Sequence, residues 1–415
     1  MPRPGAAGAP VYPPVPWLPP GPALPAGPPE ALVRWLRPRL GLFGITRLAD
    51  VTGLDHLGVP VAVACRPNGR ALSVSQGKGL TRAQAMAGAL MESIETWHAE
   101  RPGLPELWAS AIALACDRRR LDPARLPLPR GSRFRPDRPI PWLPARDLAS
   151  GAELLVPAEL VELDTCRPAE PGRGCFTLTT SGLAAGPTPA EAALHALLEL
   201  IERDAVTLWG LCDPITKAQS RLDLARVRRP DMRRLLDGLA AAGMLVGAWD
   251  ASSDLGVPTV LCHLMPDRPG VHDLPVWEFG SACRPDPEAA LLAAVLEAVQ
   301  ARLTQITGAR DDIGRERYAQ VAPERLERHR ALLRRRGGRP LPEPPWPPDL
   351  PAAAHLDRLL ERLHAAGLET VALVDLGRPE IGIPVVKLLV PGLEDGLELE
   401  GWRPGPRARA LGAVP

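Results

Sequence analysis

The sequence lacks the compositional signs of several common classes of protein. Its 49 basic and 48 acidic residues leave a formal net charge of only +1, so no overall field favours nucleic acid or an anionic membrane. Its 7 cysteines contain no C-x-x-C pair, which indicates reduced thiols without a zinc knuckle. The N-terminal stretch carries prolines where a signal peptide needs an apolar helix, and no acid-free stretch elsewhere is long enough to span a bilayer. We therefore expect a globular, cytoplasmic protein with a small or nearly neutral ligand.

The familiar nucleotide-binding loops are also missing. There is no G-x-G-x-x-G, and Gly77-Lys78-Gly79 is no Walker A loop, because no Ser or Thr follows the lysine and no glycine stands five residues before Gly77. Lysine is scarce and occurs only at Lys78, Lys217 and Lys387. A lysine kept at position 78 is a hint that a compact ammonium is required there, although a lysine capping a tight glycine turn explains it equally well. Any bound ATP must therefore be held outside the familiar phosphate loops.

Two segments stand out by composition. Residues 1–38 are rich in Pro, Gly and Ala and predict a disordered leader. A Pro- and Arg-rich stretch at about 334–353 predicts a surface insertion between two helical patterns. Repeated patterns fill most of the remaining chain, which predicts a single domain over residues 39–415.

One of these patterns is an apolar run, a turn, a Gly-x-Pro step and a second apolar run. Copies lie at 47–67, 245–266 and 370–391, with a weaker relative at 145–160. Apolar runs joined by such turns are hairpin signals, and proline at the start of the second run suits a strand edge. Hairpins that alternate with helical units predict an α+β fold, with antiparallel sheets packed on helices and not a doubly wound parallel sheet.

The second pattern is a short acidic phrase on three alanine- and leucine-rich helical stretches. Each stretch follows an apolar run and a glycine-containing loop, so one strand-loop-helix unit is used three times. The paired residues are Glu92 with Glu95, Glu199 with Glu202, and Glu297 with Gln300. On the first two helices the acids border the apolar face and do not oppose it. That position is typical of groups that line a cleft, whereas a single such pair usually faces water.

Five carboxylates and an amide at matched positions predict a site for a hard cation. Oxygen ligands favour Mg²⁺, and no Cys/His cluster suits a softer ion. Because Mg²⁺ is often bound through a few carboxylates together with substrate phosphates, a nucleotide is the expected ligand. Lys78, Arg203 and Arg310 are the candidate groups for its phosphates. His195 on the second helix is either a base or a hydrogen-bonded core residue, and the core interpretation is favoured.

These residues resemble the motifs of the YcaO family, ATP-dependent enzymes that activate peptide backbone amides. The family pattern of Ser-x3-Glu-x2-Glu, Glu-x2-Glu-Arg and Glu-x2-Gln is matched from Gly88, Glu199 and Glu297, and the resemblance covers about residues 44–394. Phrases such as ADVTGLD, VSQGKG and TGARDD are similar to the branch that works with a TfuA partner. The resemblance implies ATP bound by Ser181, Glu191, Arg203 and Gln300, and Mg²⁺ bound by Glu92, Glu95, Glu199, Glu202 and Glu297.

The reaction that the resemblance implies is transfer of the γ-phosphoryl group of ATP to a substrate amide oxygen, after a nucleophile has added to the carbonyl carbon. Positioning and charge neutralisation suffice for this step, so no protein nucleophile is needed. Sulfide as the nucleophile gives a thioamide, as in TfuA-linked relatives, whereas a Cys, Ser or Thr side chain of the peptide gives an azoline. The expected partners are a peptide or protein substrate and a TfuA-like protein, and the sequence leaves a homodimer open.

Three departures from the family pattern bear on this expectation. Gly88 stands where the family has Ser, which removes one hydroxyl contact, and Pro187 stands where Asn is expected beside the ATP loop. The C-terminus lacks the Pro-x-Pro-x-Pro ending of azoline-forming members, which argues against cyclodehydration. The alternatives to thioamide formation are an azoline-forming cyclodehydratase and a non-catalytic peptide-binding scaffold with a degenerate nucleotide site.

Overall fold

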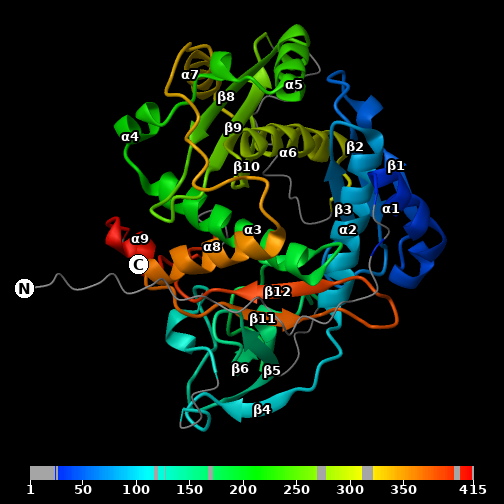
Figure 1. The fold of residues 1–415 in the computed structure, drawn as a ribbon, viewed down its shortest axis with the longest axis vertical. Helices are drawn as coiled ribbons and strands as arrows, with labels where there is room; N and C mark the ends of the chain where they lie inside the picture. Colours follow the sequence, from blue (N-terminus) through cyan, green and yellow to red (C-terminus); the bar gives the residue numbers. More distant parts are fainter. Residues whose placement is uncertain are drawn as a thin grey trace, which may run out of the picture.

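Three antiparallel sheets packed on long helices make up the fold (Figure 1). The computed structural model describes residues 24, 27–115, 120–126, 128–166, 172–268, 277–310, 321–396 and 402–413. Every pairing between its named strands is antiparallel. The predicted α+β class is therefore confirmed, while the single domain over residues 39–415 stays a prediction.

The sheets differ in size and in strand order. The first has the order β1-β2-β3, the second β10-β9-β8, and the third β4-β5-β11-β12-β7 with β6 paired to β5. The strands are β1 (Arg47–Asp50), β2 (Val61–Cys65), β3 (Val74–Lys78), β4 (Leu107–Ser110), β5 (Pro139–Asp147), β6 (Glu153–Pro157), β7 (Leu183–Ala185), β8 (Met244–Asp250), β9 (Thr259–Pro266), β10 (Glu278–Cys283), β11 (Ala372–Asp375) and β12 (Val385–Leu389).

The predicted hairpins form where the sequence places them. Strands β1 and β2 pair across the first repeat, β8 and β9 across the second, and β11 and β12 across the third. The weaker relative at 145–160 contributes to the pairing of β5 with β6. Each apolar run can bury one face on a helix while its backbone pairs with its neighbour, which explains why the pattern survives in the fold.

Three long helices lie at the centre of this arrangement. Helix α2 packs on β2 and β3, α6 packs on β9 and β10, and α3 lies between β10 above it and β12 below it (Figure 1). The helices are α1 (Pro29–Leu36), α2 (Arg82–Glu100), α3 (Pro189–Leu211), α4 (Pro214–Gln219), α5 (Pro230–Ala241), α6 (Pro287–Thr307), α7 (Pro323–Leu333), α8 (Ala352–Ala365) and α9 (Pro406–Ala410).

Helix α6 is long and apolar enough to cross a membrane, but composition alone does not make it a membrane span. In its most apolar window 61% is buried inside the protein. Its packing against β9 and β10, together with Glu297 near its middle, identifies it as a core helix of this fold.

The predicted disordered leader is wrong over its last part. Residues 29–36 form α1, which packs on α2, and Leu36 is fully buried. The proline-rich composition hides a helical stripe, because Leu32, Trp35 and Leu36 all pack into the same core cluster. A proline in its first turn also suits a helix start. Residues 1–23, 25 and 26 lie outside the described residues.

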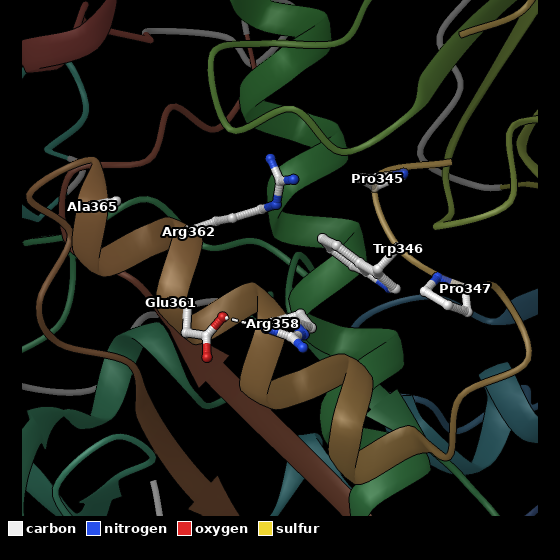
Figure 2. Close-up of a pocket in the computed structure, with 7 residues that line it drawn as sticks. All are labelled: Pro345, Trp346, Pro347, Arg358, Glu361, Arg362 and Ala365. Carbon is white, nitrogen blue, oxygen red and sulfur yellow. Dashed lines mark hydrogen bonds and ion pairs between the residues drawn. The ribbon is translucent and has the colours of Figure 1, made fainter. Parts of the chain in front are cut away.

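The predicted insertion at 334–353 joins α7 to α8 largely without helix. It is anchored: Trp346 is buried and its indole N–H donates to His355 Nδ1 of α8 at 2.7 Å. Between this connector and α8 lies an open pocket of about 460 Å³, lined by Trp346, its flanking prolines and Arg362 (Figure 2). The guanidinium carbon of Arg362 lies 5.0 Å from the centre of the indole ring. None of the predicted site residues lines this pocket.

Candidate functional site

The site is built from three copies of one unit, a short strand, a loop and a long helix: β3–α2, β7–α3 and β10–α6. Each helix begins at a side-chain cap. Thr81, Thr188 and Asp286 accept hydrogen bonds from backbone N–H groups in the first turn of α2, α3 and α6. The cap fixes where the helix starts relative to its strand, so the acids that follow are placed in the same way in each unit.

The three units are joined in a ring by the acidic helices. Glu95 of α2 accepts a hydrogen bond from Ala185 N of β7, at 2.8 Å. Glu202 of α3 accepts one from Ser281 Oγ of β10, at 2.6 Å, and another from Cys283 N, two residues further along the same strand. Glu297 of α6 pairs with Lys78 Nζ of β3, at 2.9 Å. Each unit is thus bound to the next through an acid of the repeated phrase, which brings the three helices to one place.

The first acid of the pairs on α2 and α3 is held by its own unit. Glu92 accepts a hydrogen bond from Gln76 N at 2.7 Å, and Glu199 accepts one from Gly182 N at 3.1 Å. Each carboxylate offers about four lone pairs, so these single backbone bonds leave capacity for a cation. The Glu199 side chain is 25% exposed, so it can be reached from solvent.

Burial makes the acids costly to ionise in this arrangement. It raises the pKa of Glu92, raises that of Glu95 well above its ordinary value with help from Glu92 and Glu199, and raises that of Glu199 to about 7. Burial alone would also raise the pKa of Glu297, but Lys78 and Arg203 outweigh it and lower the pKa. The raised pKa values show that the protein alone does not fully stabilise the negative charge of these three carboxylates. Carboxylate oxygens are the ligands that a hard cation prefers, and such a cation would stabilise that charge.

The predicted basic groups lie at the same site. Lys78 binds Glu297, which excludes the alternative of a lysine that only caps its glycine turn. Arg203 lies 3.7 Å from Glu199, and although burial would lower its pKa, Glu199, Glu202 and Glu297 together raise it. The charges of Lys78 and Arg310 both act to lower the pKa of Glu92, against the larger effect of burial. Cations from three separate parts of the chain therefore surround the acids.

The oxygen donors of this site suit Mg²⁺, but they do not form a complete cage around an ion. Among the described residues no group of three or more acids, histidines or cysteines is close enough to hold a metal ion unaided. Mg²⁺ keeps several waters and uses one or two carboxylates together with phosphates, so a looser set of acids suits it. That the five glutamates bind Mg²⁺ stays a prediction.

The remaining predicted residues occupy different places. Ser181 Oγ donates to Asp395 Oδ1 at 2.9 Å, beside the Gly182 N–H that binds Glu199. Glu191 is exposed in the first turn of α3 and accepts a hydrogen bond from Thr188 Oγ1. Gln300 stands on α6 one turn after Glu297, and its carbonyl accepts from Thr304 Oγ1. The assignment of these three residues to ATP stays a prediction.

The interpretation of one residue changes, and two further residues emerge. The core interpretation of His195 is wrong, because the residue is exposed. The surrounding protein, then Arg284 and Lys78, lower the pKa of His195 to about 4, so the ring is neutral near pH 7. Sequence reasoning also missed Lys387 and Asp395, whose charges act on Glu199 and Arg203. The scarcity of lysine was the available signal for Lys387.

Metal-free protein should lose stability as its acids ionise. A pKa raised from 4.5 to about 7 means that folded Glu199 holds its proton longer than the unfolded chain does. Its contribution to the free energy of unfolding is present at low pH and is lost as the pH rises through that window. We expect the difference in melting temperature between Glu199→Gln and the wild type to grow from about pH 5 to about pH 7. Thermal unfolding in EDTA measures it, and a difference independent of pH would contradict this electrostatic account.

Restoring the family's serine at position 88 should be tolerated. A Cβ at Gly88 would lie 3.3 Å from Gly77 Cα, which is tight but demands a shift of only a few tenths of an ångström. Serine is also a better helix former than glycine, so we expect Gly88→Ser to change the free energy of unfolding by less than about 1 kcal/mol. The new hydroxyl near Lys78 N should tighten ATP binding. Calorimetry with the non-hydrolysable analogue AMPPCP and Mg²⁺ checks this, and weaker binding would show that the glycine is required.

Known proteins resemble this chain over most of its length. The sequence model of the ATP- and Mg²⁺-binding YcaO cyclodehydratase family matches residues 76–394. A Rhizobium leguminosarum bv. trifolii protein encoded in the tfuA 3′ region is 37% identical over 372 residues, which is 86% of each chain. A Methanothermobacter thermautotrophicus protein is 35% identical over 376 residues, covering 88% of this chain and 94% of that protein.

Solved structures show the same fold. YcaO from Methanopyrus kandleri, bound with AMPPCP and Mg²⁺, has a TM-score of 0.67 at 25% identity and covers 89% of this chain and 92% of its own. A heterocyclase in complex with substrate and cofactor has a TM-score of 0.69 at 22% identity over 91% of this chain, which spans only 53% of that heterocyclase. The predicted cofactors, ATP and Mg²⁺, are those of the matched family. On the sequence match and the shared fold, the chain belongs to the YcaO family.

Proposed function

We propose that the protein activates a peptide backbone amide by phosphorylating its oxygen, and that with a TfuA-like partner it forms a thioamide in a ribosomally made peptide or protein. The observation that carries the proposal is the ring of acids on α2, α3 and α6, with Lys78 and Arg203 among them and no phosphate loop in the sequence. The tfuA-linked relative, similar over 86% of the chain, supports the choice of thioamide. We place the reaction in the cytoplasm, where the free cysteines of the described chain would stay reduced.

ATP, when bound, supplies the phosphoryl group that turns the amide oxygen into a leaving group. The residues of the chain neutralise and position the groups that react. Lys78 and Arg203 bring positive charge to a cluster of acids, and the acids in turn attract the metal that accompanies phosphates. Phosphoryl transfer needs little else from the protein.

We place the nucleophile outside the chain. Cys283 touches the acid ring through the hydrogen bond from its backbone N–H to Glu202. Burial raises the pKa of its thiol to about 12, so the thiolate is scarce at neutral pH. A protein thiol therefore does not serve as the sulfur nucleophile at this position. Sulfide, or a side chain of the substrate peptide, fits the requirement.

Mass spectrometry of candidate peptides decides the function. The peptide is incubated with the protein, Mg²⁺, ATP, sulfide and a TfuA-like protein, and matched reactions omit one component each. Replacement of one oxygen by sulfur, dependent on ATP and on the partner, is the expected result. Loss of one water would instead identify azoline formation, which the family description as a cyclodehydratase keeps as the second candidate.

A non-catalytic scaffold is the alternative from another class. It would bind peptide while the nucleotide site had lost its function through the changes at Gly88 and Pro187. Calorimetry distinguishes the enzyme hypothesis from the scaffold hypothesis. Binding of Mg²⁺ with AMPPCP supports an enzyme, whereas binding of peptide without any binding of nucleotide supports a scaffold.

A further inference from the structure

Lys387 is a fully buried lysine in the middle of an otherwise apolar strand. It lies on β12, where its neighbours Val386 and Leu388 are also buried. On the same face of the strand, Val385 and Leu389 pack into the apolar cluster that includes residues of α2. Packing alone would place an aliphatic side chain here, because an ammonium without exposure to water is costly. The stability of the sheet therefore does not explain a lysine at this position.

The ammonium group of Lys387 binds the turn that carries two predicted site residues. Lys387 Nζ donates to Thr179 O at 2.7 Å, and the next residue of β12 donates its N–H to Gly182 O at 2.8 Å. Strand β12 thus holds both ends of the turn from 179 to 182. Inside the turn, Ser181 N donates to Thr179 Oγ1, which fixes its shape.

This turn faces the acids of the site. Its Gly182 N–H binds Glu199, and its Ser181 hydroxyl binds Asp395. Burial lowers the pKa of Lys387 to about 8, while the charges of Asp395 and Glu199 act in the opposite direction. A single buried cation is thereby coupled to the turn, to Glu199 and to Asp395.

We propose that Lys387 is a positioning residue of the nucleotide site: its ammonium fixes the turn from 179 to 182, and with it the Ser181 hydroxyl and the Gly182 N–H that binds Glu199. This inference rests on the proposed function in taking Ser181 and Glu199 as nucleotide-site residues. It adds a residue that none of the family motifs contains.

The test is binding of Mg²⁺ with AMPPCP to the full chain, measured by calorimetry beside thermal unfolding. Lys387→Met keeps length and apolar packing but removes the charge and the donor. Because a buried charge is replaced by an aliphatic chain, we expect its melting temperature to stay or rise. The dissociation constant should increase roughly 10- to 100-fold, as for loss of one charged hydrogen bond. Lys387→Gln keeps a donor for Thr179 O without the charge and should lie between.

Lys217→Met is the matched control, because Lys217 Nζ also donates to a backbone carbonyl, that of Gly210, at 2.6 Å. It should bind like the wild type. A folded Lys387→Met with unchanged affinity would overturn the proposal. If that variant does not fold, Lys387→Gln and Asp395→Asn decide, and unchanged affinity in both overturns it equally. A wild-type chain that fails to bind Mg²⁺ with AMPPCP refutes the nucleotide site itself, which separates that failure from a failure of Lys387 alone.

Discussion

Replacing Glu199 and Glu202 together by glutamine is expected to abolish ATP turnover while the protein stays folded. Glu199 lies 3.7 Å from Arg203, and Glu202 joins α3 to β10 through two hydrogen bonds. Their loss removes two negative charges from the site that holds the cation. Loss of groups that hold or orient a metal costs at least about 10- to 100-fold each, so the double variant should fall below detection.

The fold should survive because the amide is nearly the same shape as the carboxylate. Burial already raises the pKa of Glu199 to about 7, so a neutral group at this position relieves an electrostatic cost. A glutamine at 202 can still accept a hydrogen bond from Ser281 Oγ through its amide oxygen. We therefore expect a melting temperature equal to or above that of the wild type, as is common when a functional site is neutralised.

Phosphate release from ATP in the presence of substrate peptide measures the effect. Glu361→Gln on α8 is the control, because this acid pairs with Arg358 of its own helix and makes none of the hydrogen bonds of the acid ring. Such pairs contribute little to stability, and turnover should not change. Unchanged turnover in the double variant would remove the assignment of these acids to the cation. An unfolded double variant would instead make Glu202 a structural residue.

The acidic phrase allowed much of the site to be predicted because it repeats. Three aligned helices with acids at the same offset predicted three equivalent units, and the hairpins between them follow from local turn signals. Local patterns do not specify which unit lies beside which. The ring depends on long-range contacts, such as Glu95 with Ala185 and Glu297 with Lys78, that no short window of sequence contains.

The residues that sequence reasoning missed share a physical reason. Lys387 and Asp395 lie outside the repeated helices and reach the site through a strand and a loop far along the chain. A lysine inside the run VVKLL looks like a strand-edge residue until its full burial is known. At α1 the error was of another kind: the proline-rich composition predicted disorder where an amphipathic helix forms. The average composition of a sequence window does not show which single residues become buried in the tertiary structure.

Replacing Gly77 by alanine is expected to have the largest effect on the fold. A Cβ at Gly77 would lie 2.0 Å from Ala85 O and 2.2 Å from Ala89 N, both backbone atoms of α2. A helix backbone cannot yield locally as a side chain can, so α2 would have to move away from β3 as a body. The cost should reach or exceed about 3 kcal/mol in the free energy of unfolding, the upper end of the usual range for core overpacking.

The same displacement would dismantle the site. Gln76 N binds Glu92 and Lys78 binds Glu297, and these residues flank Gly77 on both sides. Gly77→Ala should therefore lower both the free energy of unfolding, measured by chemical denaturation, and the affinity for the nucleotide. Gly238→Ala on the exposed face of α5 is the matched control, since a Cβ there meets nothing within 4 Å and alanine favours a helix by up to about 1 kcal/mol.

A substitution at Gly280 tests whether the close contact between strand and helix is a common feature of the repeated units. Its Cβ would lie 2.4 Å from Ala294 O and 2.5 Å from Ala298 N of α6, the counterpart of the contact between β3 and α2. If the three units are equivalent, Gly280→Ala should destabilise the protein to a similar degree as Gly77→Ala. A well-folded Gly77→Ala with full nucleotide affinity would mean that α2 does not rest on β3 this closely, and the placement of Glu92 and Lys78 would fall with it.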